Sequence, residues 1–311
     1  DADGAGDELF NRTADVDLEV PFGEDASYGA EFNPNVKVWQ WDAFDKTSPN
    51  YGKQTPWVAA KNGPIKFFET PLTFVNTIGI DKGNNKNNFS LSYTNMLSNG
   101  LLPNSNLRKN TLSTKFGFAL TDKLTATVYS TLTLQNTVGR NETGYSDNLM
   151  SGFRQWWQTN VDLYAQRDAY YRNYEKYGVT NSNVTWNRIS AADGTPQYWN
   201  NPYFQRWQNY QSDDRIRSFS YAQLKYDINK NLSLTTKLSH DQMNMTIEER
   251  LAVGSLAQSF GASGQNVSSG YSKSVRALSE TNFDLIGNYK YQISDKLGVQ
   301  GVVGGNIRRN F

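Results

Sequence analysis

Few side chains of this sequence are suited to catalysis. Adjacent carboxylates occur at Asp213-Asp214 and Glu248-Glu249, but glycoside hydrolysis needs two carboxyl groups roughly 5 to 10 Å apart across a cleft. Neighbours on a strand point to opposite faces of a sheet, so neither pair forms such a site. His240 is the only histidine and cysteine is absent, which excludes thiol chemistry and most metal ligation. The sequence therefore predicts a protein that is not an enzyme and has no cofactor or metal site.

The residues with the clearest binding chemistry are aromatic, and most lie in one long segment, 137–214. Aromatic rings beside amides and arginines combine apolar contact with hydrogen bonding, which suits sugar faces and peptide side chains alike. The candidates for contact with a substrate or a covering partner are Trp39, Trp41, Trp156, Trp157, Tyr164, Trp186, Trp199, Tyr203 and Trp207. The alternative is that these rings pack the segment against itself, because a large loop needs a core of its own.

Composition narrows the class of protein that has to position these residues. Of 311 residues 37% are hydrophobic, the mean hydropathy is −0.68, and no window approaches the ~18 to 20 apolar residues of a membrane-spanning helix. Aromatic residues, at 14%, are too frequent for a disordered chain. Lysine plus arginine (31) nearly balances aspartate plus glutamate (30), so a nucleic-acid partner is not expected.

From residue 72 onward apolar and polar side chains alternate with a period of two, which predicts β-strands. Leu124, Val128 and Leu132, for example, alternate with threonines of the same segment. The pattern predicts about eight strands, most of them longer than the usual ~5 or 6 residues. Their expected ranges are 72–81, 89–94, 112–120, 124–134, 215–228, 231–243, 275–293 and 297–309.

The predicted strands are joined by two kinds of connection. Short turns at 83–88, 120–124, 228–232 and 293–297 alternate with longer connections at 98–109, 137–214 and 244–274. A meander with its tight turns at one end and its large loops at the other is the plan of an outer-membrane β-barrel. A soluble antiparallel sandwich also alternates, but strand length and loop asymmetry favour the barrel.

A lipid bilayer explains this pattern. A spanning strand needs roughly 9 to 11 residues, and every second side chain then meets lipid. We expect Leu91, Phe116, Leu132 and Leu285 to point at hydrocarbon, while Thr, Ser, Asn, Lys and Asp point inward. An open sheet in lipid would leave two rows of unpaired backbone groups. Either these strands close on themselves or further strands complete the barrel. We expect the second, with this sequence an internal piece of a longer protein.

Several stretches resemble the SusC/RagA family of TonB-dependent outer-membrane transporters. The most specific is 83–95, GNNKNNFSLSYTN, which continues into GLLPNSNLRKNT at 100–111. Ser27-Tyr28-Gly29-Ala30-Glu31-Phe32, Asn201-Pro202-Tyr203 and Asp214-Arg215-Ile216-Arg217 also fit. The resemblance extends over most of the chain from about residue 27.

The resemblance implies an all-β transmembrane antiparallel β-barrel of 22 strands, filled by an N-terminal plug. This chain would supply an early barrel or loop segment (1–66), four strands (67–136), a long extracellular loop (137–214) and four more strands (215–311). The loop is expected to be partly helical, with Ser146 or Asp147 as an N-cap and Gly178 as the stop. The plug and the C-terminal strands are absent from the sequence.

The implied function is active import of oligosaccharides or oligopeptides across the outer membrane of a Gram-negative bacterium. A SusD/RagB-like surface lipoprotein would form a lid, and TonB would act through an N-terminal segment that this sequence lacks. Outer-membrane lipid and the cargo are the other expected partners. Two alternatives stay open: a passive porin-like channel, and a soluble secreted β-sheet module that binds glycans.

Overall fold

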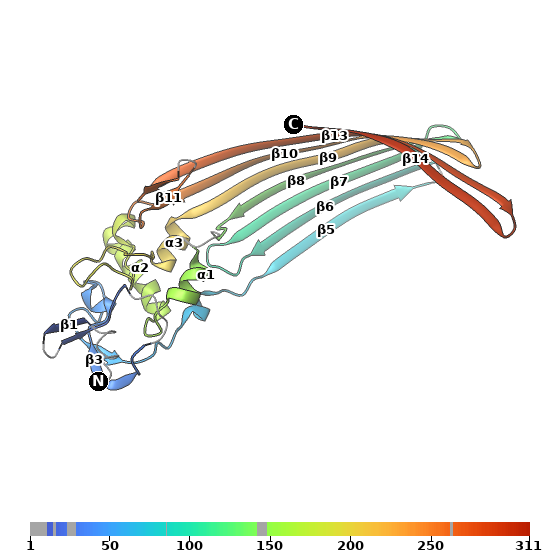
Figure 1. Ribbon diagram of the computed structural model, residues 1–311. Helices are drawn as coiled ribbons and strands as arrows, with labels where there is room; N and C mark the ends of the chain where they lie inside the picture. Colours follow the sequence, from blue (N-terminus) through green and yellow to red (C-terminus); the bar gives the residue numbers. More distant parts are fainter. Residues whose placement is uncertain (1–10, 15–16, 24–28, 85, 142–147, 262–263) are drawn as a thin grey trace.

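A computed structural model of the chain describes residues 11–14, 17–23, 29–84, 86–141, 148–261 and 264–311. It consists of one long, curved antiparallel sheet with a smaller domain at one end (Figure 1). We call this smaller part, formed by the described residues of 11–67 and 139–209, the loop domain. The predicted N-cap residues Ser146 and Asp147, and the motif residues Ser27 and Tyr28, lie outside the described residues.

The sheet has eight strands that follow one another in chain order, each antiparallel to its neighbours. This confirms the predicted meander. From one edge to the other the strands are β5 (Thr73–Gly83), β6 (Asn87–Asn99), β7 (Asn106–Ala119), β8 (Leu124–Val138), β9 (Tyr210–Asn229), β10 (Leu232–Leu251), β13 (Gly270–Ser294) and β14 (Leu297–Asn310).

The tight turns all lie at the end of the sheet far from the loop domain, and the longer connections lie at the loop-domain end (Figure 1). The connection between β8 and β9 is 139–209, because β9 already begins at Tyr210. The connection between β6 and β7 is only 100–105, shorter than expected, because the ladder continues to the pair Asn99 and Asn106. The connection between β10 and β13 is 252–269 instead of the expected 244–274, because both strands are longer than predicted. Strands β9, β10 and β13, of 20, 20 and 25 residues, extend well beyond the length that a bilayer requires.

The strand register gives the sheet one apolar and one polar face. Tyr93, Leu112 and Leu132 form one cross-strand row on the apolar face. Thr94, Thr111 and Thr133 form the adjacent row on the polar face. Hydroxyl pairs such as Thr77 and Thr94, 2.9 Å apart, hydrogen-bond across the polar face. Residues of alternating type thus point to opposite sides, as the period of two predicts.

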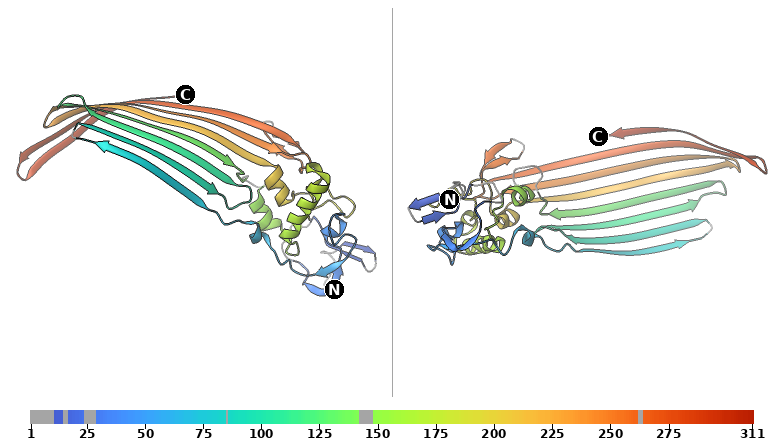
Figure 2. Two further views of the ribbon diagram at one scale, coloured as in Figure 1. Left: turned by 180° about the vertical axis from the view of Figure 1, so that it is seen from behind. Right: turned by 60° about the horizontal axis from the view of Figure 1, so that its bottom comes forward.

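The sheet is a single layer, as the views from behind and from below show (Figure 2). Val128, Leu285 and Ile307, on the apolar face, are 43%, 44% and 72% exposed. Among the described residues, the buried hydrophobic side chains belong to the loop domain or to the adjoining Leu251 and Ala252. A soluble sandwich would instead pack this face against a second sheet.

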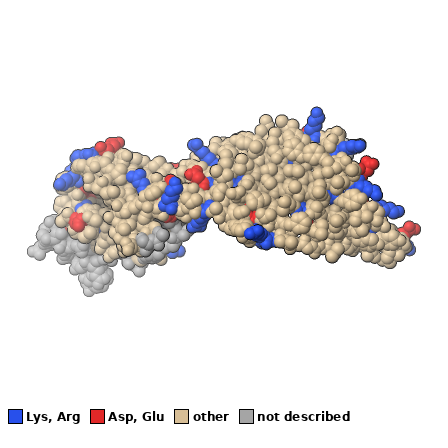
Figure 3. Space-filling model, turned by 90° about the horizontal axis from the view of Figure 1, so that it is seen from above, with Lys and Arg blue, Asp and Glu red and all other residues tan. Residues whose placement is uncertain are grey.

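Leu91, Phe116, Leu132 and Leu285, which we expected to point at hydrocarbon, do not meet in a dry interior: all lie on the uncovered apolar face. In a space-filling view, charged side chains lie mainly at the ends and edges of the sheet and are sparse over its middle (Figure 3).

The outer strands β5 and β14 each pair with one neighbour within the described part of the chain, and not with each other. The eight strands therefore form an open sheet rather than a closed eight-stranded barrel. None of the described helices is long and apolar enough to cross a lipid bilayer.

The loop domain is built from short elements. Its main helix is α2 (Leu163–Tyr177), which Asp162 caps by accepting hydrogen bonds from two backbone N–H groups. As predicted, Gly178 ends this helix; its positive φ of 77° is a conformation that glycine adopts without the strain of a Cβ atom. The other elements are β1 (Asn11–Ala14), β2 (Asp17–Glu19), β3 (Asn33–Val38), η1 (Trp41–Phe44), β4 (Thr55–Trp57), η2 (Pro64–Phe67), α1 (Leu149–Ser151), η3 (Gly152–Trp156), η4 (Val179–Asn181) and α3 (Pro202–Gln208).

The orientation of the sheet predicts opposite responses to a charge on its two faces. If the apolar face meets lipid, Val128→Arg in the full-length protein should lower the free energy of unfolding in lipid vesicles by roughly 2 to 4 kcal/mol. Thr127→Arg, one residue away on the polar face, is the matched control and should lower the free energy of unfolding much less. Equal losses for both variants would contradict the assignment of the faces.

Candidate functional site: the loop domain and the polar face

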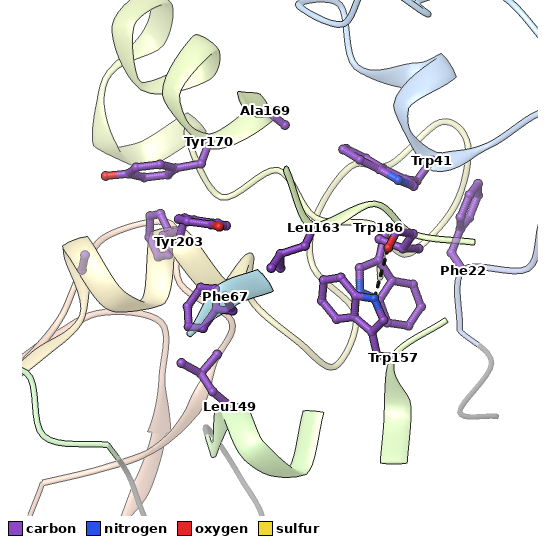
Figure 4. Close-up of a cluster of buried hydrophobic side chains, with 13 residues drawn as sticks. Phe22, Trp41, Phe67, Leu149, Trp157, Leu163, Ala169, Tyr170, Trp186 and Tyr203 are labelled. Atoms are coloured by element: carbon purple, nitrogen blue, oxygen red, sulfur yellow. Dashed lines mark hydrogen bonds between the residues drawn. The ribbon is translucent and has the colours of Figure 1, made fainter. Parts of the chain in front are cut away.

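The loop domain has its own hydrophobic core, which joins segments that are far apart in sequence (Figure 4). Phe67 packs edge-on against Phe153 and Tyr203, each with ring centroids 5.1 Å apart. Trp157 packs against Trp186 at 6.1 Å, and its indole N–H donates to a backbone carbonyl 3.2 Å away. Residues before the first long strand and residues after the fourth thus fold together, which the sequence alone did not predict.

Four of the nine candidate residues belong to this core. Trp41, Trp157, Trp186 and Tyr203 are only 4%, 6%, 3% and 7% exposed. Their rings are in contact with other core side chains. For Trp157, Trp186 and Tyr203 this is internal packing, the alternative given in the sequence analysis; Trp41 lies outside the segment to which that alternative applied.

The other five candidates are more accessible. Trp39, Trp156, Tyr164 and Trp199 are half-buried. Trp207 is 41% exposed. For these five residues, contact with a substrate or partner stays a prediction.

Buried amides hold the backbone of the loop domain in place. The Asn201 side chain accepts from the N–H groups of Tyr203 and Phe204 at the start of α3, and donates to two carbonyls in other segments. Asn187 accepts from two N–H groups and donates to the carbonyl of Phe22, 2.7 Å away. Buried amide groups need a hydrogen-bond partner. These amides are therefore engaged within the domain rather than available to a ligand.

Arg206 fastens α3 to the end of the sheet. Its guanidinium donates to the carbonyls of Pro103 at 2.9 Å and Gly139 at 2.6 Å, in two different interstrand connections. The side chain of Asn104 donates back to the carbonyl of Arg206 at 2.9 Å. Burial lowers the pKa of Arg206, opposed by the charge of Glu69. The hydrogen bonds tie the loop domain to the strand ends.

The exposed side of α2 carries a row of tyrosines. Tyr171, Tyr174 and Tyr177 are 42%, 41% and 43% exposed. The Arg167 guanidinium lies 4.5 Å from the ring centre of Tyr164 on the same helix. Tyrosine and arginine are the side chains that most often dominate protein interfaces. Of the tyrosines on this helix, only Tyr164 was among the candidates named from the sequence. Their spacing of three or four residues along a helix could have identified the others.

The polar face of the sheet carries a second group of aromatic and charged side chains. Tyr129 and Tyr221 stack with ring centroids 5.4 Å apart, and Phe219 lies within 6.3 Å of both. The ammonium of Lys237 lies 4.7 Å from the ring centre of Tyr221. None of these was a candidate from the sequence, because their proximity depends on the pairing of β8, β9 and β10. Among the described residues, no three His, Asp or Glu side chains are placed to hold a metal ion.

Comparisons with known proteins agree with the architecture. Three structures of the RagAB system match with TM-scores of 0.53, 0.51 and 0.51 and 12 to 13% identity: the RagAB peptide transporter, and the RagAB peptide importer in closed-closed and open-open states. The chain therefore has the fold of part of these RagAB transporter structures. The matches cover 78%, 81% and 77% of this chain but only 25%, 27% and 24% of the other chains, so it spans about a quarter of their length. No family model and no curated protein matches the sequence.

The core predicts an effect of alkaline pH on the loop domain. Burial raises the pKa of Tyr203 from its ordinary value of 10 to about 12. The folded state therefore holds this proton more tightly than the unfolded state. The resulting stabilisation is complete below pH ~10 and is lost as the pH rises from about 10 to about 12.

Tyr203→Phe, which has no proton to lose, should move the alkaline opening of the loop domain to higher pH. The red shift of the emission from the core tryptophans reports this opening. Tyr51→Phe, at a ring that is 49% exposed, should follow the wild type. If the Tyr203→Phe variant also opens at the same pH as the wild type, the proton on Tyr203 does not control the transition.

Proposed function

We propose that this chain forms part of the wall and one extracellular domain of an energised importer in the outer membrane of a Gram-negative bacterium. The observation that carries the proposal is the single-layer sheet, apolar on one face and polar on the other, with a folded domain at one end only. A soluble glycan-binding module would have to cover the apolar face. A membrane barrel places this face against lipid and the polar face around a lumen.

The open edges of the sheet support a larger barrel. In hydrocarbon each unpaired backbone group costs several kcal/mol, so β5 and β14 require further strands beside them. A barrel of 22 strands has a lumen wide enough to need a plug. Import through such a barrel would be driven by TonB, which displaces the plug. Both the plug and the TonB-contacting segment would belong to the rest of the protein.

We place the loop domain outside the cell, under a SusD/RagB-like lipoprotein lid. The matched RagAB structures, described as those of a peptide transporter and importer, support such an assembly and a cargo of oligopeptides. A cargo of oligosaccharides stays the alternative that the family resemblance implies. The exposed tyrosine row of α2 would contact the lid. The protein acts by binding and translocation and not as an enzyme, because the structures it resembles are those of transporters.

The lid contact is tested by the double substitution of Tyr171→Ala and Tyr174→Ala in the full-length protein. Truncation of a buried interface tyrosine costs about 1 to 2 kcal/mol, or roughly ten-fold in affinity. Recovery of the lipoprotein with the purified transporter should fall accordingly. Tyr198→Ala, at a ring that is 59% exposed elsewhere in the loop domain, is the control. Undiminished recovery would place the lid elsewhere.

The energy requirement is tested in cells that carry the whole transporter. Uptake of labelled oligopeptides and oligosaccharides should be abolished when TonB is deleted or the proton gradient is collapsed. It should also fall strongly without the lipoprotein. Uptake that persists in cells lacking TonB would instead establish a passive channel.

A further inference from the structure

The tight-turn ends of the strands are staggered along the sheet. The cross-strand row of Gly83 and Asn88, the last pair of the β5–β6 hairpin, reaches β13 at Asp284. The last paired residue of β13, Ser294, lies ten residues further on, and the β13–β14 hairpin projects beyond the others (Figure 1). With the turns at one level, ~3.3 Å per residue and ~4.8 Å between strands, this stagger corresponds to a tilt of roughly 45°, as in outer-membrane barrels.

The apolar face ends at a level that follows the turns and not the cross-strand rows. Leu134 is ten residues from the first residue of β8, and Phe283 is eleven residues from the last residue of β13. After each of them the next residue on that face is polar, Asn136 and Thr281. The row of Leu134, however, reaches β13 at Ala277, six residues beyond Phe283. A crossing of hydrocarbon needs roughly 9 to 11 residues, so the border runs obliquely across the rows, as tilted strands require.

Beyond this border three strands continue side by side. This part, which we call the outer extension, consists of residues 210–220 of β9, 240–251 of β10 and 270–281 of β13. On the side that continues the apolar face, β10 presents only polar residues: His240, Gln242, Asn244, Thr246, Glu248 and Arg250. Ile216 in β9, and Val275 and Ala277 in β13, are the apolar exceptions on this side. The outer extension is therefore largely polar where the rest of the same face is apolar.

The same side of the outer extension carries an ion pair. The ammonium of Lys273 lies 3.3 Å from the carboxylate of Glu248. The hydroxyl of Tyr271 donates to the same carboxylate oxygen at 2.7 Å. A charged side chain on the lipid-facing side of a barrel is destabilising at the bilayer midplane and nearly neutral at its surfaces. The pair therefore indicates that this part of the wall lies outside hydrocarbon.

We propose that the outer leaflet ends at the oblique border, and that the outer extension stands above the membrane with water on both faces. His240 and Thr281, whose Nδ1 and Oγ1 atoms are 2.9 Å apart, lie at its foot and would contact the polar headgroups of the lipid. At ~3.3 Å per residue and a tilt of roughly 45°, the strand from Thr281 to Gly270 rises about 25 Å. The loop domain, at this end of the sheet (Figure 1), is thereby held away from the lipid surface.

The proposal rests on the proposed function, which places the apolar face in lipid, and deepens it by fixing the level at which the lipid ends. Leu132 and Ser279 test it directly, because cross-strand pairing places both in one row of this face. Leu132 is eight residues from the tight-turn end of its strand, and Ser279 is fifteen. A border along the rows would give the two residues the same environment, whereas the oblique border separates them.

The test uses nitroxide labels in the full-length transporter, free of other cysteines, in vesicles of phosphatidylethanolamine and phosphatidylglycerol. Leu132→Cys and Ser279→Cys are labelled separately. Collision rates are then measured with oxygen, which enters hydrocarbon, and with a nickel chelate, which stays in water. The ratio of oxygen to nickel collisions should be several-fold higher at Leu132 than at Ser279. Leu285→Cys, in the same strand as Ser279, is the matched control and should behave like Leu132.

Insertion of a charge gives an independent measurement if a labelled variant does not assemble. Leu132→Arg should lower the denaturant midpoint of unfolding in the same vesicles, because it places a charge in hydrocarbon. Ser279→Arg should leave the midpoint unchanged.

Hydrocarbon-like collision ratios at Ser279 as well as at Leu132 would overturn the proposed border while leaving the proposed function intact. Equal losses of the midpoint for the two arginine variants would do the same. Water-like ratios at both Leu132 and Leu285 would overturn the placement of the apolar face in lipid, and with it the proposed function itself.

Discussion

A sheet with apolar side chains along one entire face must keep that face out of water, because exposed apolar surface costs about 25 cal/mol per Å². Here no second layer among the described residues covers it, and the buried hydrophobic groups lie in the loop domain and next to it. The apolar face therefore depends on an apolar environment, which a bilayer supplies without any packing partner. The same environment requires every backbone group to be paired. The long, continuous ladders meet this requirement within the sheet, and the outer edges of β5 and β14 are the exception.

The loop domain is stabilised in a different way from the sheet. It folds around buried aromatic rings, in the manner of a water-soluble domain, and satisfies its irregular backbone with asparagine side chains. Arg206 then connects it to the ends of the sheet through carbonyl groups. A domain fixed in this way presents a defined surface at one end of the sheet. Its exposed tyrosines, and not its buried tryptophans, are the groups available to a partner.

The polar face serves neither of these two needs, since most of its side chains are polar and it builds no core. Its threonine and serine ladders are compatible with water. The aromatic side chains around Tyr221 therefore have no evident structural necessity. Their position facing the lumen of the proposed barrel is what makes them candidates for contact with cargo.

The sequence by itself determined the strands, their two faces and the asymmetry of the connections. These follow from local patterns, because alternation with a period of two is a property of neighbouring residues. The tertiary structure alone decided which aromatic residues are available. Trp157 and Trp207 look equivalent in sequence, yet one is 6% and the other 41% exposed. It also decided that residues 17–67 pack with 139–209, and that Tyr129, Tyr221 and Lys237 lie together on the polar face. Such contacts join residues distant in the chain, so only the register and the packing of the folded protein define them.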